Sequence, residues 1–509
     1  MSGNLYERFL AVFSERGDAP AIELADGTTW SYAQLTDQVG RLARRLVEAG
    51  VEPGDRVAIQ VDKSPQALFT YLACFQAGAV YLPLNTAYTG PEVSYFLSDA
   101  QPRCFVCDPR RADELAPIAG EAGVSAVLNM DPTGAGTLTD GLDAVTPMRE
   151  VVERDPDDLA AICYTSGTTG RSKGAMLSHR NLESNARTLH SYWGFQDGDV
   201  LLHALPLFHV HGLFVASNTA LLNGSKMLFL PKFDADQVTR LLPKASVMMG
   251  VPTFYVRLLE RDDFTKDLVA KMRLFVSGSA PLQPETWRQF KERTGFEILE
   301  RYGMTEAGMI TSNPLNGERR PGTVGFPLPN VQVRVAKEDG TVLGTEEIGI
   351  LEIKGPNLFQ GYWNKPEKTA EEFRPDGFFI TGDNAKIDDR GYVHIVGRAK
   401  DLIISGGYNV YPKEIELTLD AMNGVKESAV FGVPHPDFGE AVTAMVVAEA
   451  GKEDTLSEKG LIDACRTQIA GYKTPKRIFF ADTLPRNTMG KVQKAQLRSE
   501  YESTFQGAA

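Results

Sequence analysis

The chain has 509 residues, of which 43% are hydrophobic and 23% charged, and its formal net charge is −13. This length exceeds what one ordinary hydrophobic core holds, so the composition predicts a globular protein of two or more domains. The acidic balance argues against a nucleic-acid-binding surface, which is normally basic. Any anionic substrate must therefore be attracted by a few placed Arg and Lys residues.

The five cysteines, an odd number, fit a reducing compartment. Cys104 and Cys107 form a C-x-x-C in "PRCFVCDP", but a zinc site needs a second pair of ligands, and none lies nearby in the sequence. We expect both to be structural residues of a buried strand. The start "MSGNLYERFLAVF" lacks the pattern of a secretory signal, and no apolar run of about 18 residues occurs. The sequence predicts a cytoplasmic protein without a membrane span.

Helical and strand patterns alternate over the chain up to Lys400. Residues 31–50 have apolar residues at helical spacing, with Ser31 as the predicted N-cap and Gly50 as the predicted end of a helix. "VAIQV" at 57–61 then predicts a buried strand. Similar helix–strand units recur in "PEVSYFLSDAQPRCFVCD" and "DQVTRLLPKASVMMGVP". This alternation favours α/β layers with largely parallel sheets.

A glycine- and hydroxyl-rich motif, "YTSGTTGRSKGAMLSH" at 164–179, follows the apolar "AAIC". Glycines allow backbone N–H groups to turn inward around a phosphate, and hydroxyl groups and Lys173 add donors and charge. The spacing is not that of a Walker A loop, because no Gly-Lys is followed by Ser or Thr. The motif predicts a phosphate-binding loop, whereas residues 130–150, rich in Gly, Thr and Asp, predict a surface loop.

The last part of the chain has a different pattern. After "GRAKDLIISGGYNVYPKEIE" come a helix over 413–422, the strands "SAVFGVP" and "AVTAMVVAEA", a helix over 459–471, the strand "RIFFAD" and a final helix. This length suffices for a separate α+β domain. We place the boundary at Lys400, which predicts domains over residues 1–399 and 400–509.

The motifs together resemble those of the adenylate-forming superfamily, which contains acyl-CoA synthetases, peptide-synthetase adenylation domains and luciferases. After the phosphate loop come, in the order of that family, "ALPLFHVHGL", "SGSAPL", "YGMTE", "GFFITGD", "GRAKDLIISGGYNVYPKEIE" and "LPRNTMGKVQK". The resemblance covers essentially the whole chain. It implies a large N-terminal domain of layered α/β subdomains, with mixed sheets and a small β-barrel-like part, and a small mobile α+β C-terminal domain.

The resemblance also implies the chemistry. A carboxylate attacks the α-phosphate of ATP, and the acyl group then passes to the thiol of coenzyme A. Two anions must approach each other, so the site has to supply positive charge where charge develops. By resemblance Lys491, in "NTMGK", is that catalytic cation, and Glu306 holds Mg²⁺, which bridges phosphate oxygens as a hard Lewis acid.

Nucleotide binding is assigned by the same resemblance. Tyr302 would stack on adenine, Thr305 would contact the α-phosphate, and Asp383 would accept from the ribose hydroxyls with the help of Arg398. The full set of expected nucleotide-binding residues is Thr165, Ser166, Gly167, Thr168, Thr169, Gly170, Lys173, Ser279, Ala280, Tyr302, Gly303, Thr305, Asp383 and Arg398.

The second half-reaction is assigned to other motifs. In the family the C-terminal domain turns between two orientations, and Lys400 sits where the hinge would be. Gly406 and Gly407 would leave room for the pantetheine arm of coenzyme A. His209 would act at the junction of the acyl and thiol channels, and the role of His211 stays open.

Arg301, in "LERYGMTEAG", has two interpretations. It can pair with the neighbouring Glu300, or it can bind the second carboxylate of a small diacid, since the planar guanidinium suits a carboxylate. This stretch resembles malonyl-CoA synthetases, in which the residues equivalent to Val210 and Met309 flank the malonate α-carbon. The family commonly has threonine where this chain has Val210, so tolerance for methylmalonate stays open. The other expected acid-binding residues are His209, Ser277, Ser279 and Met304.

The sequence thus predicts an acid–thiol ligase that joins malonate to coenzyme A through malonyl-AMP, releasing AMP and pyrophosphate. One alternative is a CoA ligase for another small acid such as methylmalonate. A second is an adenylation module that loads a carrier protein, which the absence of a carrier domain disfavours. A third is a non-enzymatic ATP-binding protein. The expected partners are small molecules, with a lysine acetyltransferase or deacetylase acting on Lys491.

Overall fold

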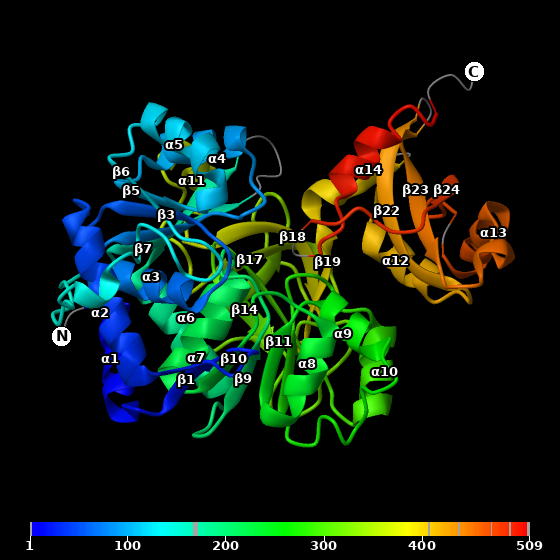
Figure 1. The fold of residues 1–509 in the computed structure, drawn as a ribbon. Coiled ribbons are helices and arrows are strands. Elements are labelled where there is room, and N and C mark those ends of the chain that lie inside the picture. Colours follow the sequence, from blue (N-terminus) through cyan, green and yellow to red (C-terminus); the bar gives the residue numbers. More distant parts are fainter. Residues whose placement is uncertain are drawn as a thin grey trace. The chain divides into compact units, whose positions relative to one another are not determined.

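The computed structural model describes residues 3–165, 172–405, 408–435, 438–469, 471–487 and 490–505 (Figure 1). Several predicted site residues lie outside these ranges: Ser166, Gly167, Thr168, Thr169, Gly170, Gly406 and Gly407.

The chain forms two compact units. The first consists of Met1–Gln332 and Lys354–Gly377, and the second of Val333–Ile353 and Phe378–Ala509. The predicted domain boundary at Lys400 lies inside the second unit and stays a prediction.

A six-stranded sheet in the first unit follows the predicted alternation of helices and strands. Its order is β6-β5-β3-β4-β7-β8, and its neighbouring strands are parallel except β7 and β8. Cys104 and Cys107 begin and end β5, and both are buried free thiols, as predicted. The strands are β3 (Arg56–Gln60), β4 (Val80–Pro83), β5 (Cys104–Cys107), β6 (Ala126–Asn129), β7 (Leu159–Thr165) and β8 (Lys173–Ser178).

A nine-stranded sheet in the same unit has the order β15-β14-β13-β12-β11-β9-β10-β1-β2. The strands from β13 to β1 in this order are parallel, and antiparallel strands complete both edges. The strands are β1 (Pro20–Glu23), β2 (Thr29–Ser31), β9 (Val200–His203), β10 (Lys226–Phe229), β11 (Val247–Gly250), β12 (Leu274–Ser277), β13 (Leu299–Met304), β14 (Gly308–Ser312) and β15 (Phe326–Pro327).

Helices pack against these sheets through apolar faces. The predicted helix after Ser31 is α2, where Ser31 and Gln34 form a reciprocal capping box and the helix ends two residues before Gly50. The helices of the first unit are α1 (Leu5–Arg16), α2 (Tyr32–Glu48), α3 (Pro65–Gln76), α4 (Gly90–Ala100), α5 (Ala112–Glu121), α6 (His179–Tyr192), α7 (Asn218–Asn223), α8 (Ala235–Leu241), α9 (Pro252–Leu259), α10 (Pro284–Thr294) and α11 (Pro366–Glu371). A π-helix, His211–Ser217, precedes α7.

The second unit has two sheets. A four-stranded sheet has the order β16-β17-β18-β19 and contains β16 (Gln332–Ala336), β17 (Gly349–Lys354), β18 (Phe379–Ile387) and β19 (Val393–Arg398). The other sheet contains β20 (Ile403–Ser405), β21 (Tyr408–Val410), β22 (Val425–His435), β23 (Gly439–Ala448) and β24 (Arg477–Phe480). Its helices are α12 (Pro412–Asp420), α13 (Glu458–Gln468) and α14 (Lys494–Glu500).

This arrangement confirms the predicted fold class, which is a large layered α/β part followed by a smaller α+β part. The elements expected in the last part of the chain all occur, in the expected order. Among the described residues, no helix combines the length and apolar character that crossing a membrane requires.

A buried histidine joins the N-terminal helix to the core of the first unit. His179 begins α6, its Nδ1 accepts the backbone N–H of Leu5 at 3.2 Å, and its ring packs edge-on against Phe75. Burial, helped by the positive charge of Arg154, lowers the pKa of His179 to about 4. The folded protein therefore disfavours the protonated imidazole.

We predict that the first unit loses stability as the pH falls below the ordinary histidine pKa. Above pH 6.5 both the folded and the unfolded chain carry neutral His179, whereas below it only the unfolded chain gains the proton. By linkage the loss from this residue is about 2 kcal/mol between pH 8 and pH 5. The measurement is urea unfolding followed by tryptophan fluorescence, since all four tryptophans lie in the first unit. His179→Asn, which keeps an acceptor for Leu5, should show a smaller pH dependence; an equal dependence would contradict the assignment.

Candidate active site

The residues predicted to bind the acid lie in or near the nine-stranded sheet, on its parallel strands and on the segments that follow them. Ser277 is the last residue of β12, Arg301 lies in the neighbouring β13, and the segment after β9 leads into the π-helix. The carboxyl ends of parallel strands meet at one edge of a sheet, which is the usual place for a ligand site in α/β proteins. Ser279 has a left-handed backbone with a φ of 72°, a strain that such sites often hold.

Arg301 is buried, with 3% of its surface exposed. Its Nε and Nη2 atoms have no hydrogen-bond partner among the described residues. Burial lowers the pKa of the guanidinium to about 9, and the nearby Tyr255 hydroxyl opposes this shift only in part. The side chain is therefore still protonated at neutral pH and presents unused N–H groups inside the protein.

The pairing of Arg301 with Glu300, one of the two interpretations, is not what the structure has. Neighbouring residues of a strand point to opposite faces of the sheet. Glu300 accepts the backbone N–H of Leu282 at 3.0 Å. Among the described residues no carboxylate forms an ion pair with Arg301.

The backbone of Gly278 makes room for the guanidinium. A Cβ atom at Gly278 would lie 2.3 Å from both Cζ and Nη1 of Arg301. Two further buried polar atoms nearby lack a hydrogen-bond partner among the described residues, namely Ser277 Oγ and His211 Nε2. The positive charge of Arg301 helps to lower the pKa of His211, so the two side chains are close enough to interact. This set of donors around one cation can hold a small carboxylate.

The residues 209–211 border the same region. His211 Nδ1 lies 3.1 Å from Ser279 Oγ, and the backbone N–H of His211 donates to His209 Nδ1 at 3.2 Å. Val210 is buried and adjoins a cavity of about 10 Å³, with room for one water molecule at most. The structure thus joins His211, whose role the sequence leaves open, to Ser279.

The turn between β13 and β14 carries Thr305 and Glu306 and is fixed by two asparagines from elsewhere. Asn185 binds both backbone groups of Met309, at 3.1 Å through Oδ1 and 2.9 Å through Nδ2. Asn357 donates to the carbonyls of Ala307 and Met309 at 2.7 and 3.1 Å. Sequence reasoning missed both asparagines, because nothing in their local sequence marks them.

Gly303 of β13 and Met309 of β14 pack closely against each other beside this turn. A Cβ atom at Gly303 would lie 2.4 Å from the Met309 Cε and 2.2 Å from the carbonyl oxygen of Gly308. Tyr302, Met304 and Thr305 are half-buried along the same stretch, as is Ala280 after β12.

A polar network connects Lys173 to Glu306. Lys173 Nζ contacts Glu372 at 2.8 Å and lies 4.0 Å from the centre of the Tyr362 ring. The Tyr362 hydroxyl lies 2.7 Å from Glu372 and 3.1 Å from Glu306. Tyr362 and Glu372 were not predicted, since contacts made almost 200 residues from Lys173 leave no local signal. Thr165 ends β7 and its hydroxyl lies 3.4 Å from the Lys173 carbonyl.

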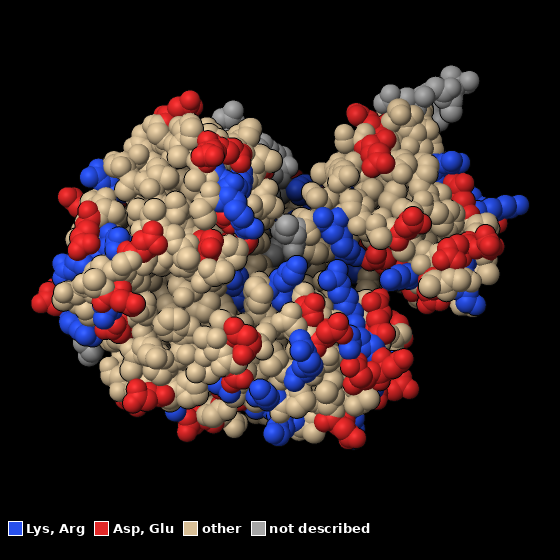
Figure 2. Space-filling model, viewed as in Figure 1, with Lys and Arg blue, Asp and Glu red and all other residues tan. Residues whose placement is uncertain are grey.

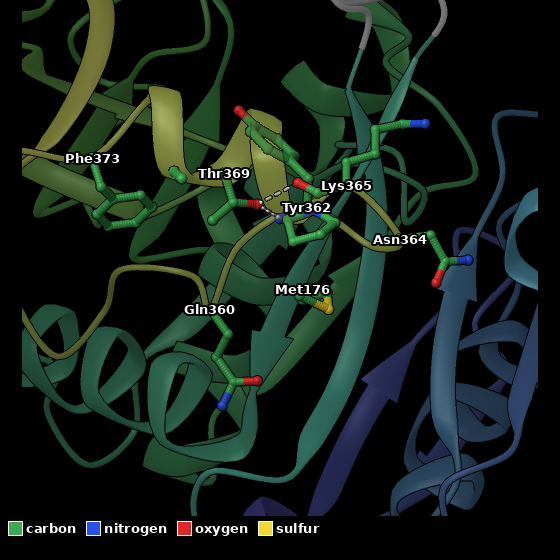
Figure 3. A pocket seen from close by; sticks show the side chains of 9 residues that line it. Met176, Gln360, Tyr362, Asn364, Lys365, Thr369 and Phe373 are labelled. Atoms are coloured by element: carbon green, nitrogen blue, oxygen red, sulfur yellow. Dashed lines mark hydrogen bonds between the residues drawn. The ribbon is translucent and has the colours of Figure 1, made fainter.

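The Tyr362 ring also lines a pocket of about 560 Å³ (Figure 3). In this view Thr369 bonds to Tyr362 and Lys365 and so ties α11 to the pocket wall. The remaining lining residues, among them Met176 and Phe373, are largely apolar and do not point toward a common centre. The pocket is a surface feature behind the Lys173–Glu306 network.

The structure describes the other predicted residues within the second unit. Asp383, in β18, is buried and forms an ion pair with Arg398 of β19 at 2.9 Å, so the two expected ribose-binding residues are adjacent. Lys400 is exposed in a short 3₁₀ turn after β19, and partial burial of its ammonium group lowers its pKa. Lys491 is exposed, and its backbone N–H donates to Asn487 Oδ1 at 2.9 Å.

The residues present suit a metal ion that a nucleotide carries. Among the described residues no group of three metal-binding side chains occurs. Mg²⁺ bound to ATP needs only one or two protein carboxylates, since phosphates and water supply the remaining ligands. Glu306, 6% exposed and held near Tyr362, provides such a carboxylate.

On the face that Figure 2 shows, Lys and Arg side chains are interspersed with Asp and Glu. Arg301 lies beneath the surface, so its attraction for an anion acts inside the protein.

Comparisons with known proteins agree over nearly the whole chain. The profile described as "AMP-binding enzyme" matches residues 9–363, and the profile "AMP-binding enzyme C-terminal domain" matches residues 414–491. Malonate–CoA ligase of Arabidopsis thaliana is 35% identical over 99% of this chain and 90% of that protein. Feruloyl-CoA synthase of an Amycolatopsis species is 36% identical over 93% of this chain and 94% of that protein.

A solved structure agrees in fold and in sequence. The crystal structure of ATP-bound MatB from Rhodopseudomonas palustris superposes with a TM-score of 0.96 at 54% identity, over 99% of this chain and 100% of that chain.

We predict that Gly278→Ala displaces the Arg301 guanidinium, because the new methyl group and Cζ cannot both occupy their places. Affinity for a small dicarboxylate should fall at least about tenfold, while the melting temperature changes little. Gly120→Ala is the matched control, since a Cβ there meets nothing within 4 Å in helix α5. Unchanged affinity in Gly278→Ala, measured by calorimetric titration, would show that the guanidinium does not contact the ligand.

Proposed function

Because this chain belongs to the family of AMP-binding enzymes, we propose that it ligates malonate to coenzyme A at the expense of ATP. A malonate oxygen attacks the α-phosphorus of ATP and pyrophosphate leaves, which gives malonyl-AMP. The coenzyme A thiol loses its proton, and the thiolate attacks the carbonyl carbon that is joined to AMP. AMP then leaves. The products are malonyl-CoA, AMP and pyrophosphate.

The observation that supports malonate as the substrate is the buried, still protonated Arg301, whose Nε and Nη2 atoms have no hydrogen-bond partner in the described part of the chain. Leaving a charge unpaired inside a protein costs several kcal/mol, on the order of the burial penalty for an ion. A substrate carboxylate removes that penalty, and the fork of the guanidinium accommodates both of its oxygens. An apolar acid gives no such compensation. Malonate can place one carboxylate on Arg301 and leave the other for adenylation.

The reacting carboxylate and the α-phosphate repel each other, so cations have to approach them. We assign this role to Lys491. Glu306 would hold Mg²⁺, which supplies Lewis-acid neutralisation of the phosphate charge. Lys173 would contribute a further positive charge at the phosphates, with Tyr362 and Glu372 holding it close to Glu306.

The remaining residues are assigned to nucleotide and thiol binding. Asp383 would bind the ribose hydroxyls with Arg398, and Tyr302 would stack on the adenine. Lys400 would be the hinge that lets the second half-reaction follow the first. His209 would lie between the acyl and thiol groups.

Location and regulation are part of the proposal. All five cysteines are buried free thiols, which supports the cytoplasm as the compartment. Lys491 is exposed and therefore accessible to an acetyltransferase or deacetylase. Acetylation would remove its charge and stop the first half-reaction.

We predict that Lys491→Ala reduces malonyl-AMP formation by a factor on the order of 10² or more, the usual cost of removing a preorganised charge at a reacting centre. The thioester step from supplied malonyl-AMP should keep its rate, because Lys491 acts only in the first step. Pyrophosphate release and malonyl-CoA formation measure the two steps separately. Lys459→Ala, which removes an exposed lysine of α13, is the control. Equal loss in both steps would contradict this role.

We predict that Arg301→Ala lowers kcat/KM for malonate by roughly 30- to 5,000-fold, which corresponds to the loss of one side of a shielded charge pair. Butyrate, which has no second carboxylate, should lose little. The ratio of kcat/KM for malonate over butyrate therefore decides the question. Arg319→Ala is the matched control, because Arg319 is a half-buried arginine satisfied by the carbonyls of Pro314, Glu297 and Leu315. An unchanged ratio in Arg301→Ala would rule out a dicarboxylate substrate.

A further inference from the structure

A lysine with no assigned role is buried next to the end of strand β9. Lys63 follows β3, and only 8% of its surface is exposed. Its Nζ lies 2.8 Å from His203 Nδ1, donates to the His203 carbonyl at 2.8 Å, and lies 4.2 Å from the centre of the Phe229 ring. His203 is itself 1% exposed. Burial lowers the pKa of Lys63 well below its ordinary value, and two hydrogen bonds and the ring contact fix its amino group.

The contacts of His203 determine which ring nitrogen carries the proton. Its Nε2 lies 2.9 Å from the carbonyl oxygen of Gly212, which can only accept. Nε2 is therefore the protonated nitrogen, and Nδ1 keeps the lone pair that accepts from Lys63. Burial and the nearby Lys63 both lower the pKa of His203, which keeps the ring neutral. Lys63 thus holds His203 in the tautomer that donates to Gly212.

The hydrogen bond to Gly212 anchors the π-helix His211–Ser217. The Ser217 hydroxyl donates to the same carbonyl at 2.9 Å, and its oxygen lies 3.1 Å from His203 Nε2. Gly212 has no room to move sideways, since a Cβ there would lie 2.0 Å from the Pro206 carbonyl oxygen. π-helical turns are uncommon and concentrate at functional sites, where surrounding contacts hold them.

This π-helix forms a wall of the acid site. Val210 directly precedes the π-helix. The first residue of the π-helix, His211, contacts Ser279, and the charge of Arg301 helps to lower the pKa of His211. A shift of the π-helix would therefore move Val210 and His211 relative to Arg301. Apart from Ser279, which His211 contacts, the residues assigned to the nucleotide lie on other elements.

We propose that Lys63 and His203 are positioning residues that set the acid selectivity of this site by holding the π-helix in place. The proposal rests on the function proposed above, because selectivity is defined for its acid substrate. Neither side chain touches the reacting atoms. Lys63 acts through the tautomer of His203, and His203 acts through the carbonyl of Gly212.

The test is a double-mutant cycle on the full-length protein. Lys63→Met keeps the length of the apolar stem but removes the donor to His203. It should raise KM for malonate and lower kcat/KM about 10- to 100-fold, as expected for a small displacement of a pocket wall. KM for ATP and for coenzyme A should rise less than KM for malonate, because only Ser279 and His209 of their assigned residues contact the π-helix. The ratio of kcat/KM for malonate to kcat/KM for methylmalonate should change as well. Lys226→Met is the matched control, since Lys226 pairs with Glu23 at the start of the neighbouring β10.

The second arm replaces the histidine. His203→Gln has an amide N–H that can donate to Gly212 whatever Lys63 does. Adding Lys63→Met to His203→Gln should therefore lower kcat/KM for malonate by a much smaller factor than adding it to the wild type does. An equal loss of kcat/KM for malonate in the two backgrounds would overturn the proposal. Equal rises in the KM values for malonate, ATP and coenzyme A would overturn it as well. Malonate-dependent pyrophosphate release by the wild type tests the proposed function separately. If it fails, the same cycle is measured with the acid that the enzyme accepts.

Discussion

The buried guanidinium of Arg301 constrains the packing, the charge and the hydrogen bonding of the residues around it. It has to fit between the sheet and the residues after β12, and Gly278 leaves that space by having no side chain. It has to stay protonated although burial lowers its pKa. Its hydrogen-bonding capacity is left partly unused by the protein. Such an arrangement costs stability, and a ligand carboxylate offsets that cost only while it is bound. The selectivity that we propose for an acid with two carboxylates rests on this one imbalance.

Several polar side chains around the site are held by hydrogen bonds or ion pairs, in contrast to the guanidinium of Arg301. Asn185 and Asn357 hold the turn that carries Glu306 by bonding its backbone. Glu372 and Tyr362 hold Lys173. Buried polar groups in proteins are nearly always hydrogen-bonded, so the exceptions point to ligands or missing partners. Here the hydrogen-bonded groups fix the shape of the site, and we propose that the unsatisfied guanidinium selects the acid that binds.

The local structure was largely predictable because it depends on short-range pattern. Ser31 caps a helix as its side chain and spacing required, and Cys104 and Cys107 lie in a buried strand as predicted. The stretch "LERYGMTEAG" drew attention to Arg301, and the resemblance to the adenylate-forming superfamily implied the role of Glu306. The alternative partner for Arg301, Glu300, could be dismissed only from the structure, since pairing depends on which face of β13 each side chain occupies.

The sequence by itself determined the fold class, the order of the elements, the family and the identity of the charged residues in the motifs, because each of these is written in local spacing and residue type. Only the tertiary structure decided which of those charges are paired. Lys63 and His203 are 140 residues apart, and Asn185 is 124 residues from Met309. Contacts over such distances arise when separate strands and helices pack together, and no local pattern records them. Only these tertiary contacts decide whether an arginine is a neutralised surface charge or a buried site for an anion.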